Sequence, residues 1–214
     1  MQFQLLIVLV CCVFAYLLGS INFAILISRA FYGKDVRNYG SNNAGMTNVF
    51  RNFGKIPAII TFIGDFAKGI VSIIVCNLLF LLFFKIESPI YASGLIGICA
   101  LLGHVFPIFY KFKGGKGVAV SAGVLLAVDL TVFLCVILIF ALIFVISKIV
   151  SLSSIVSAFT YPVFTLIKCL ILGESLIDSV IRVFFALIIS SIIVFMHRAN
   201  IKRLLSGNEP KIKM

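Results

Sequence analysis

Long apolar runs separated by short polar segments are the dominant pattern of this 214-residue chain. A helix needs about 20 apolar residues to cross the hydrocarbon core of a bilayer, and within lipid only helices and closed barrels satisfy their own backbone groups. The runs here are continuous, which indicates helices. The pattern therefore predicts an all-α, polytopic integral membrane protein with seven transmembrane helices, near residues 3–28, 56–84, 89–109, 118–128, 130–147, 151–172 and 177–196.

The fourth run is short, and its boundary depends on Asp129. Read as one piece, residues 118–147 would form a single long helix with Asp129 near the centre of the bilayer, where a lone carboxylate is costly. We therefore expect the helix to break at Asp129. An arrangement of five spans with re-entrant segments is the alternative.

Lysine and arginine gather in four of the connecting segments. Residues 29–55 carry five, residues 111–116 three, residue 148 one and the tail from residue 198 five, which makes 14 of the 18. Cytoplasmic loops of membrane proteins are enriched in these residues. Seven spans place all four segments on one side, so we predict an external N-terminus, a cytoplasmic C-terminus and three cytoplasmic polar motifs.

The composition excludes a soluble globular protein, because 62% of the residues are hydrophobic and only 12% are charged. The net charge of +11 favours anionic partners, of which lipids are one. The six cysteines fall in apolar runs without metal-binding spacing, so we expect core residues and no metal. Residues 1–28 lack the features of a cleaved signal peptide, and we expect residues 1–214 to form a single domain.

The first polar cluster is the segment Asp35–Arg51, DVRNYGSNNAGMTNVFR. It combines two arginines with Ser41, Thr47 and four asparagines, which supply neutral hydrogen bonds. Arg51 can hold a phosphate group through two parallel N–H donors. The segment therefore indicates a site for a polar anion. A capped turn that leads into the second span is the alternative.

The second cluster is the glycine-rich loop at residues 110–117, YKFKGGKG. Gly114, Gly115 and Gly117 allow successive backbone N–H groups to turn toward one point, and a helix that starts near residue 118 adds the positive end of its dipole. Lys116 adds a charge. We expect this loop to bind phosphate; a basic loop held by lipid headgroups is the alternative. His104, which precedes the loop, is either a base or a histidine with a structural role.

Two further sets of polar residues accompany these clusters. In the second span, Asp65 and Lys68 share a helical face, where they either pair and hold the bundle or orient groups of the first cluster. The third cluster, residues 197–210, places His197 and Asn200 on one face and ends in a turn with the only carboxylate of the tail, Glu209. A basic tail that stops transfer through the membrane is the alternative for the third cluster.

The sequence lacks the motifs of several enzyme classes. We find no G-x-S-x-G, no H-E-x-x-H and no spacing typical of a Ser-His-Asp triad, so neither an acyl-enzyme nor a zinc mechanism is supported. No histidine is followed five positions later by aspartate, which argues against the common acyl-CoA-dependent glycerolipid acyltransferases.

Taken in order, three motifs resemble the cytoplasmic motifs of the bacterial acyl-phosphate:glycerol-3-phosphate acyltransferases. They are GSNNAGMTNVFR (40–51), GHVFPIFYKFKGGKGVAVSAG (103–123) and HRANIKRLLSGNEPKI (197–212), and GSINF (19–23) and GDFAKG (64–69) are similar to further stretches of that family. Asn22 stands where the family usually has proline, and Asn42 where glycine is commoner. These departures alter helix geometry and loop freedom near Ser41.

The resemblance implies transfer of a fatty acyl group from acyl phosphate to the 1-hydroxyl of glycerol 3-phosphate, without a cofactor, at the cytoplasmic face of the bacterial inner membrane. It implies catalytic roles for Ser41, Arg51, Lys116 and His197. It implies substrate binding by Ser41, Asn43, Thr47, Asn48, Arg51, His104, Gly114, Gly115, Lys116, Gly117, His197, Asn200 and Glu209. The expected partners are glycerol 3-phosphate, acyl phosphate and membrane lipids, and no nucleic acid.

Acyl phosphate carries its own leaving group, so the protein must chiefly bring two anions together and stabilise the departing phosphate. We expect direct attack by the substrate hydroxyl, whose proton passes to His197 or to a phosphate oxygen. A transporter of organic phosphates is the rival hypothesis. It fits poorly because the outer loops, residues 85–88 and 173–175, are very short. A lipid-binding scaffold without turnover is the third reading.

Overall fold

The structure is a computed structural model, and it describes residues 2–212. Within that range every regular element is helical, and the helices form two compact units that meet in sequence at Val128 and Asp129. The first unit holds α1 Gln2–Ser20, α2 Phe23–Tyr32, α3 Met46–Phe53, α4 Lys55–Phe84, α5 Ile90–Val105 and α6 Val118–Val128, with two short 3₁₀ turns, η1 Val36–Asn38 and η2 Ile108–Tyr110. The second unit holds α7 Leu130–Ser147, α8 Val150–Leu172, α9 Leu176–Met196 and α10 Arg198–Leu205.

Six helical segments between residues 2 and 212 are long and apolar enough to cross a membrane. α6 is apolar but has only 11 residues, which at 1.5 Å per residue makes it about half as long as a ~30 Å hydrocarbon core is thick. The predicted all-α, integral membrane fold is confirmed, and five of the seven predicted spans begin and end within one residue of a helix. The count of seven crossings stays a prediction.

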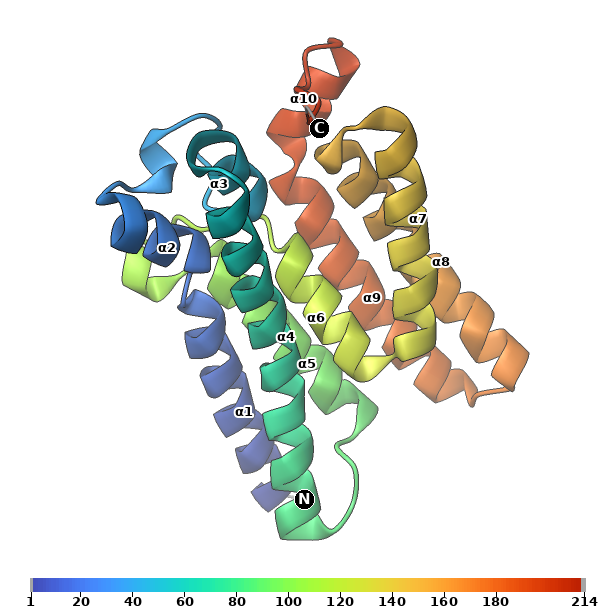
Figure 1. Cartoon of the computed structure of the whole chain (residues 1–214). Helices are drawn as coiled ribbons and strands as arrows, with labels where there is room; N and C mark the ends of the chain where they lie inside the picture. Colours follow the sequence, from blue (N-terminus) through green and yellow to red (C-terminus); the bar gives the residue numbers. More distant parts are fainter. Residues whose placement is uncertain (1, 213–214) are drawn as a thin grey trace. The chain divides into compact units, whose positions relative to one another are not determined.

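The predicted first span, 3–28, is wrong as a single helix, because the chain leaves the helical conformation between Ser20 and Phe23. The Asn22 side chain caps the N-terminus of α2 by accepting a hydrogen bond from the N–H of Ile25 at 3.1 Å. Asparagine is a favoured N-cap residue because its side-chain oxygen replaces a missing backbone acceptor. In Figure 1, α2 turns away from the axis of α1 at this point.

The predicted span 89–109 matches the candidate membrane span Ile90–Tyr110, but its helix α5 ends earlier, at Val105. Pro107 follows two residues later, and proline cannot donate the backbone hydrogen bond that would continue a helix. The chain instead forms η2, and the residues that follow it, Lys111 and Phe112, adopt left-handed backbone conformations with φ of 57°. The glycine-rich loop therefore starts from a sharply turned segment.

The predicted break at Asp129 is confirmed, but its physical reason differs from the expected one. α6 ends at Val128, and Asp129 caps α7 by accepting from the N–H of Val132 at 3.0 Å. The other carboxylate oxygen lies 2.6 Å from the ammonium group of Lys168 on α8. Asp129 is thus a paired cap residue, whereas the sequence suggested a lone charge to be kept out of the lipid.

Close helix packing builds each unit. In the first unit α1 packs against α5 and α4 packs against α6 and α5, as Figure 1 shows. At the α1–α5 crossing, a side chain on Gly103 would overlap the carbonyl oxygen of Tyr16, and at the α4–α6 crossing one on Gly123 would overlap that of Phe66. Small residues let helix backbones approach in this way in membranes. In the second unit α8 packs against both α7 and α9.

Candidate active site

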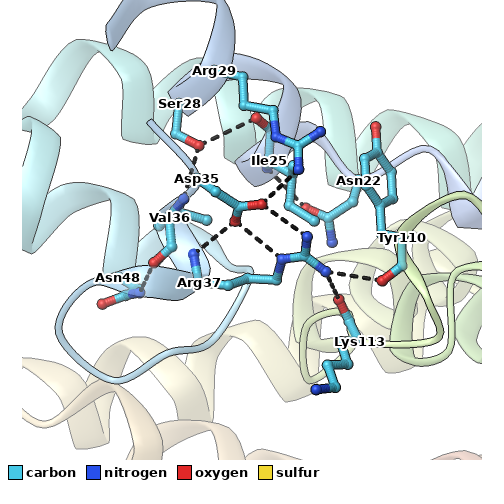
Figure 2. A network of polar contacts seen from close by, with 10 residues as sticks. All are labelled: Asn22, Ile25, Ser28, Arg29, Asp35, Val36, Arg37, Asn48, Tyr110 and Lys113. Carbon is cyan, nitrogen blue, oxygen red and sulfur yellow. Dashed lines mark hydrogen bonds and ion pairs between the residues drawn. The ribbon is translucent and has the colours of Figure 1, made fainter. Parts of the chain in front are cut away.

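Asp35 organises the loop that follows α2. Its carboxylate lies 2.7 Å from the guanidinium group of Arg29 and 2.8 Å from that of Arg37, and it also accepts from the backbone N–H of Arg37 at 3.0 Å (Figure 2). Hydrogen bonds from Arg37 lower the pKa of this carboxyl well below its ordinary value, against the effect of burial. Asp35 is therefore ionised at neutral pH and holds both arginines in place.

Arg37 joins the first polar cluster to the glycine-rich loop. Its Nη1 donates to the carbonyl oxygen of Tyr110 at 2.9 Å and to that of Lys113 at 3.1 Å, as Figure 2 shows. These residues are more than 70 positions apart in sequence. Two of the three polar clusters thus lie together at one end of the first unit, the end opposite the start of α1 (Figure 1).

Asn48, in α3, shapes the first cluster from inside. Its side-chain amide donates to the carbonyl oxygens of Val36, Tyr39 and Asn43 at 2.9 to 3.1 Å. Its oxygen accepts from the backbone N–H of Ser41 at 3.1 Å. The side chain is buried, so Asn48, which was predicted to bind substrate, serves here to fold the loop that carries Ser41.

The other predicted residues of the first cluster lie around that loop. Ser41 and Arg51 are exposed, whereas Asn43 and Thr47 are half-buried. Ser41 stands between Gly40 and Asn42, whose φ angles of 57° and 55° are left-handed. Asparagine tolerates this conformation better than most residues, although glycine adopts it most readily. Asn42 therefore keeps the turn that positions the hydroxyl group of Ser41.

The glycine-rich loop corrects one part of the predicted phosphate cradle. The N–H of Gly114 donates to the carbonyl oxygen of Val105 at 3.2 Å, and that of Gly115 donates to the carbonyl oxygen of His104 at 3.1 Å. These two groups complete the end of α5, so the prediction that they turn toward a ligand is wrong. The first amides of α6, which begins directly after Gly117, have the orientation that favours an anion.

The structure nevertheless explains why glycine stands at each of these three positions. A side chain on Gly114 would overlap the carbonyl oxygen of His104, and one on Gly115 would overlap the His104 ring nitrogen Nε2. Gly117 has a φ of 84°, and a side chain there would overlap Leu101. The loop therefore lies directly on the end of α5. Lys116, between two of these glycines, is half-buried.

Asp65, Lys68 and His104 form a buried polar group behind this loop. The ammonium group of Lys68 lies 2.8 Å from Asp65 and 2.9 Å from Nδ1 of His104. It also donates to the carbonyl oxygens of Gly19 and Ile21, at 2.9 and 2.8 Å, where α1 ends. Of the two sequence-based alternatives, Asp65 and Lys68 pair with each other and hold the helices.

The third cluster belongs to the second unit, where Glu209 is its centre. One carboxylate oxygen of Glu209 accepts from Ser151 at 2.7 Å and from Asn200 at 2.6 Å, and the other accepts from Arg203 at 2.7 Å. Burial raises the pKa of Glu209, but these hydrogen bonds lower it by more, so the net shift is downward. Glu209 fastens the tail to the start of α8.

His197 stands at the junction of α9 and α10 and is buried. Its Nδ1 lies 2.8 Å from the carbonyl oxygen of Ile193. Since a carbonyl oxygen only accepts, Nδ1 carries the proton, and a neutral ring has its lone pair on Nε2. In this tautomer the chemistry of the ring allows Nε2 to accept a proton.

Two residues that organise the site were not predicted as site residues. Arg37 links the two loops, and Asn22 donates from its side chain to the carbonyl oxygen of Ala44 at 3.3 Å. A signal for Arg37 exists in the spacing Asp35-x-Arg37, which favours a local ion pair. Asn22 carried a polar side chain inside an apolar run, which is the usual mark of a cap or a buried contact.

The fold and the first two clusters define a helical integral membrane protein with a cation-rich polar site at one end of its first unit. A sequence profile described as "Glycerol-3-phosphate acyltransferase" matches residues 9–207. The chain belongs to the glycerol-3-phosphate acyltransferase family, as the three motifs indicated.

Individual relatives agree with this assignment. The glycerol-3-phosphate acyltransferases of Staphylococcus haemolyticus (strain JCSC1435) and Staphylococcus aureus (strain JH9) are 39% and 36% identical to this chain. Each alignment spans 218 residues and covers 96% of this chain and 98% of the relative.

Two solved structures of PlsY (YgiH), an integral membrane glycerol 3-phosphate acyltransferase, have the same fold as this chain. The glycerol 3-phosphate form has a TM-score of 0.82 and 38% identity, and it covers 96% of both chains. The lysophosphatidic acid form has a TM-score of 0.79 and 36% identity, and it covers 96% of this chain and 95% of that one.

Proposed function

We propose that this protein transfers a fatty acyl group from acyl phosphate to the 1-hydroxyl of glycerol 3-phosphate, giving lysophosphatidic acid and inorganic phosphate. The observation that carries the proposal is the pair of hydrogen bonds from Arg37 to the carbonyl oxygens of Tyr110 and Lys113. They bring the loop of Ser41 beside the loop of Lys116, so that groups suited to two phosphorylated substrates lie together. The related PlsY, crystallised in glycerol 3-phosphate and lysophosphatidic acid forms, supports this substrate and product.

The proposed reaction needs no nucleophile from the protein. The 1-hydroxyl oxygen attacks the acyl carbonyl carbon, the bond from that carbon to the phosphate oxygen breaks, and phosphate leaves with the bonding electrons. The hydroxyl proton passes to Nε2 of His197 or to an oxygen of the leaving phosphate. Cations and helix-terminal amides offset the repulsion between the two substrates and stabilise the leaving group.

We assign the roles by cluster. Ser41, Asn43, Thr47 and Arg51 bind glycerol 3-phosphate, with Asn48 shaping their loop. Lys116, Gly117 and the first amides of α6 bind the phosphate of the acyl donor, and Gly114 and Gly115 hold that loop on α5. His197 and Asn200 act in the same reaction, and Glu209 fixes the position of Asn200 through its 2.6 Å hydrogen bond.

We place the protein in the bacterial cytoplasmic membrane, with these polar segments on the cytoplasmic side, because the lysines and arginines concentrate there. Membrane lipids surround the apolar faces of the helices and take up the product. We also infer that residues 1–214 act as one acyltransferase domain. The family profile, which runs through both compact units, supports this inference.

The test supplies purified protein with radiolabelled glycerol 3-phosphate and either acyl phosphate or acyl-CoA. We expect labelled lysophosphatidic acid with acyl phosphate alone. Product with acyl-CoA alone would overturn the donor assignment, and uptake into vesicles without product would favour a transporter. No product and no uptake would favour the scaffold.

Two variants link this test to the site. Arg51→Ala and Ser41→Ala should each raise the KM for glycerol 3-phosphate by roughly 10- to 100-fold, the loss expected for a hydrogen bond to a charged group. The KM for acyl phosphate should change much less. Normal kinetics in both variants would remove the first cluster from the site.

A further inference from the structure

The hydrogen bonds of the Lys68 ammonium group show which ring nitrogen of His104 carries the proton. Hydrogen bonds from Nζ reach the carbonyl oxygens of Gly19 and Ile21 and the ring nitrogen Nδ1 of His104, at 2.8 to 2.9 Å. Asp65 Oδ1 lies 2.8 Å from Nζ but makes no aligned hydrogen bond, so it contributes charge. All three protons are thus assigned.

An ammonium group has no lone pair and cannot accept a hydrogen bond. Nδ1 of His104 must therefore be the acceptor in its 2.9 Å contact with Lys68. In a neutral imidazole the other nitrogen then carries the proton. His104 is consequently fixed with N–H on Nε2, the opposite tautomer to the one that Ile193 imposes on His197.

The Nε2 group of His104 points at the glycine-rich loop. A side chain on Gly115 would overlap this nitrogen and would also approach the carbonyl oxygen of Ala44 to 2.6 Å, so Gly115 lies close to both the His104 ring and the first loop. The His104 side chain is 5% exposed. Among residues 2–212, no group accepts a hydrogen bond from Nε2, so this N–H can donate to a ligand.

We propose that Lys68 is a positioning residue that fixes His104 as a neutral N–H donor, and that the Nε2–H of His104 binds a phosphate oxygen at the glycine-rich loop. The proposal rests on the proposed function for the identity of that phosphate. His104 is then a substrate-binding donor and not a base, because its only lone pair is occupied by Lys68. Asp65 balances the buried charge of Lys68.

The same contacts explain why Lys68 is placed where α1 ends. The carbonyl oxygens of Gly19 and Ile21 lie at the break between α1 and α2, and Asn22, within that break, donates to Ala44. Lys68 thus connects the break and the ring of His104 through direct hydrogen bonds, and Asn22 connects the break to the first loop.

Nitrogen NMR of the histidine rings tests the tautomer without turnover. The chain has two histidines, so ¹⁵N-histidine labelling gives two rings, and His197→Gln assigns them. At about pH 8, above the ordinary histidine pKa of ~6.5, we expect a protonated Nε2 in His104 and a protonated Nδ1 in His197. Addition of inorganic phosphate should shift the Nε2 signal of His104. A protonated Nδ1 in His104, or a phosphate-insensitive signal, would overturn the proposal.

Lys68→Met removes the donors while keeping a side chain of similar length. We expect His104 to lose its fixed tautomer and the KM for acyl phosphate to rise roughly 10- to 100-fold. Lys168→Met is the matched control, since it removes a lysine paired with Asp129 in the second unit, and it should leave the His104 signals unchanged. An unchanged His104 spectrum in Lys68→Met would refute the positioning role even in an active enzyme.

Substitutions of His104 separate a donor from a base. Glutamine keeps an N–H group near the position of Nε2 but cannot act as a base, whereas leucine keeps only the volume. We therefore expect His104→Gln to retain most activity and His104→Leu to show the raised KM. A raised KM for glycerol 3-phosphate alone would mean that His104 donates to the phosphate of that substrate. An equal loss of kcat in both variants would refute the donor role.

Discussion

A buried amide, Asn48, and a half-buried carboxylate, Asp35, determine the shape of the first polar cluster. Asn48 binds three carbonyl oxygens and one backbone N–H of a single loop, and Asp35 holds two arginines. The sequence predicted that Ser41 and Arg51 would belong to the site, because serine supplies a neutral hydrogen bond and Arg51 can hold a phosphate group through two parallel N–H donors. It did not indicate that Asn48 faces inward, since an asparagine in a polar segment has no periodic pattern that reveals its direction.

Asn48→Asp tests this structural role. The substitution replaces two N–H donors with a carboxylate oxygen that faces the carbonyl groups of Val36, Tyr39 and Asn43, so the loop should open. We expect the KM for glycerol 3-phosphate to rise about tenfold or more. Asn38→Asp makes the same change on an exposed side chain of this loop and should have little effect. Equal kinetics of the two variants would show that the buried amide does not shape the site.

Glu209 makes the stability of the folded tail decrease as the pH falls. Its folded-state pKa lies below the unfolded value of about 4.3, so the carboxylate stabilises the tail above that pH, and this stabilisation is lost as the pH falls through the folded-state pKa. We expect hydrogen exchange of residues 198–212 to quicken below about pH 4, after correction for the intrinsic rate.

Glu209→Gln should show the quicker exchange of the tail already at neutral pH, because the charge that holds Arg203 is gone. The helical core of α8 provides the internal control and should exchange at the same rate in both proteins. A tail whose protection is equal in the wild type and Glu209→Gln at neutral pH would contradict the role given to this carboxylate.

At the level of elements, apolar runs predicted the bounds of five helices well, even where Pro162 or the Asp65–Lys68 pair lies within the helix. α4, α6, α7, α8 and α9 lie within one residue of their predicted bounds. The two errors have one cause: the apolar runs continue through the break at Asn22 and past the end of α5, whereas hydrogen bonding does not. Hydropathy records where lipid is tolerated, and capping decides where a helix ends.

Asn22 offers a test of that distinction. Asn22→Ala removes the N-cap of α2 and the contact with Ala44, and we expect it to lower stability by about 0.5–2 kcal/mol. Asn22→Asp keeps the cap oxygen but loses the donor to Ala44, so it should retain most of the stability while raising the KM for glycerol 3-phosphate. Thermal unfolding in detergent and steady-state kinetics measure the two effects. Identical behaviour of both variants would mean that the cap and the loop contact are not separable.

For the whole molecule, the distribution of lysine and arginine predicts that the glycine-rich loop and the C-terminal tail lie on the same side of the membrane. This sidedness requires that α6 and α7 each cross the membrane, as α8 and α9 do. α6 has only 11 residues, fewer than the roughly 20 that cross a bilayer core, so this pair of crossings depends on the break at Asp129. The break at Asp129, with its capping hydrogen bond, supplies the physical support.

Labelling of single cysteines decides this topology. In a variant without the six native cysteines, we introduce Lys113→Cys, Lys211→Cys or Glu87→Cys, each at an exposed position. A maleimide that does not cross membranes should label position 87 in intact cells, and positions 113 and 211 only after the membrane is opened. Retained acyl transfer by each variant is the control for native insertion. Labelling of position 211 but not 113 from outside would mean that residues 118–147 cross once, which gives six spans, and it would separate the third cluster from the site proposed for the first two.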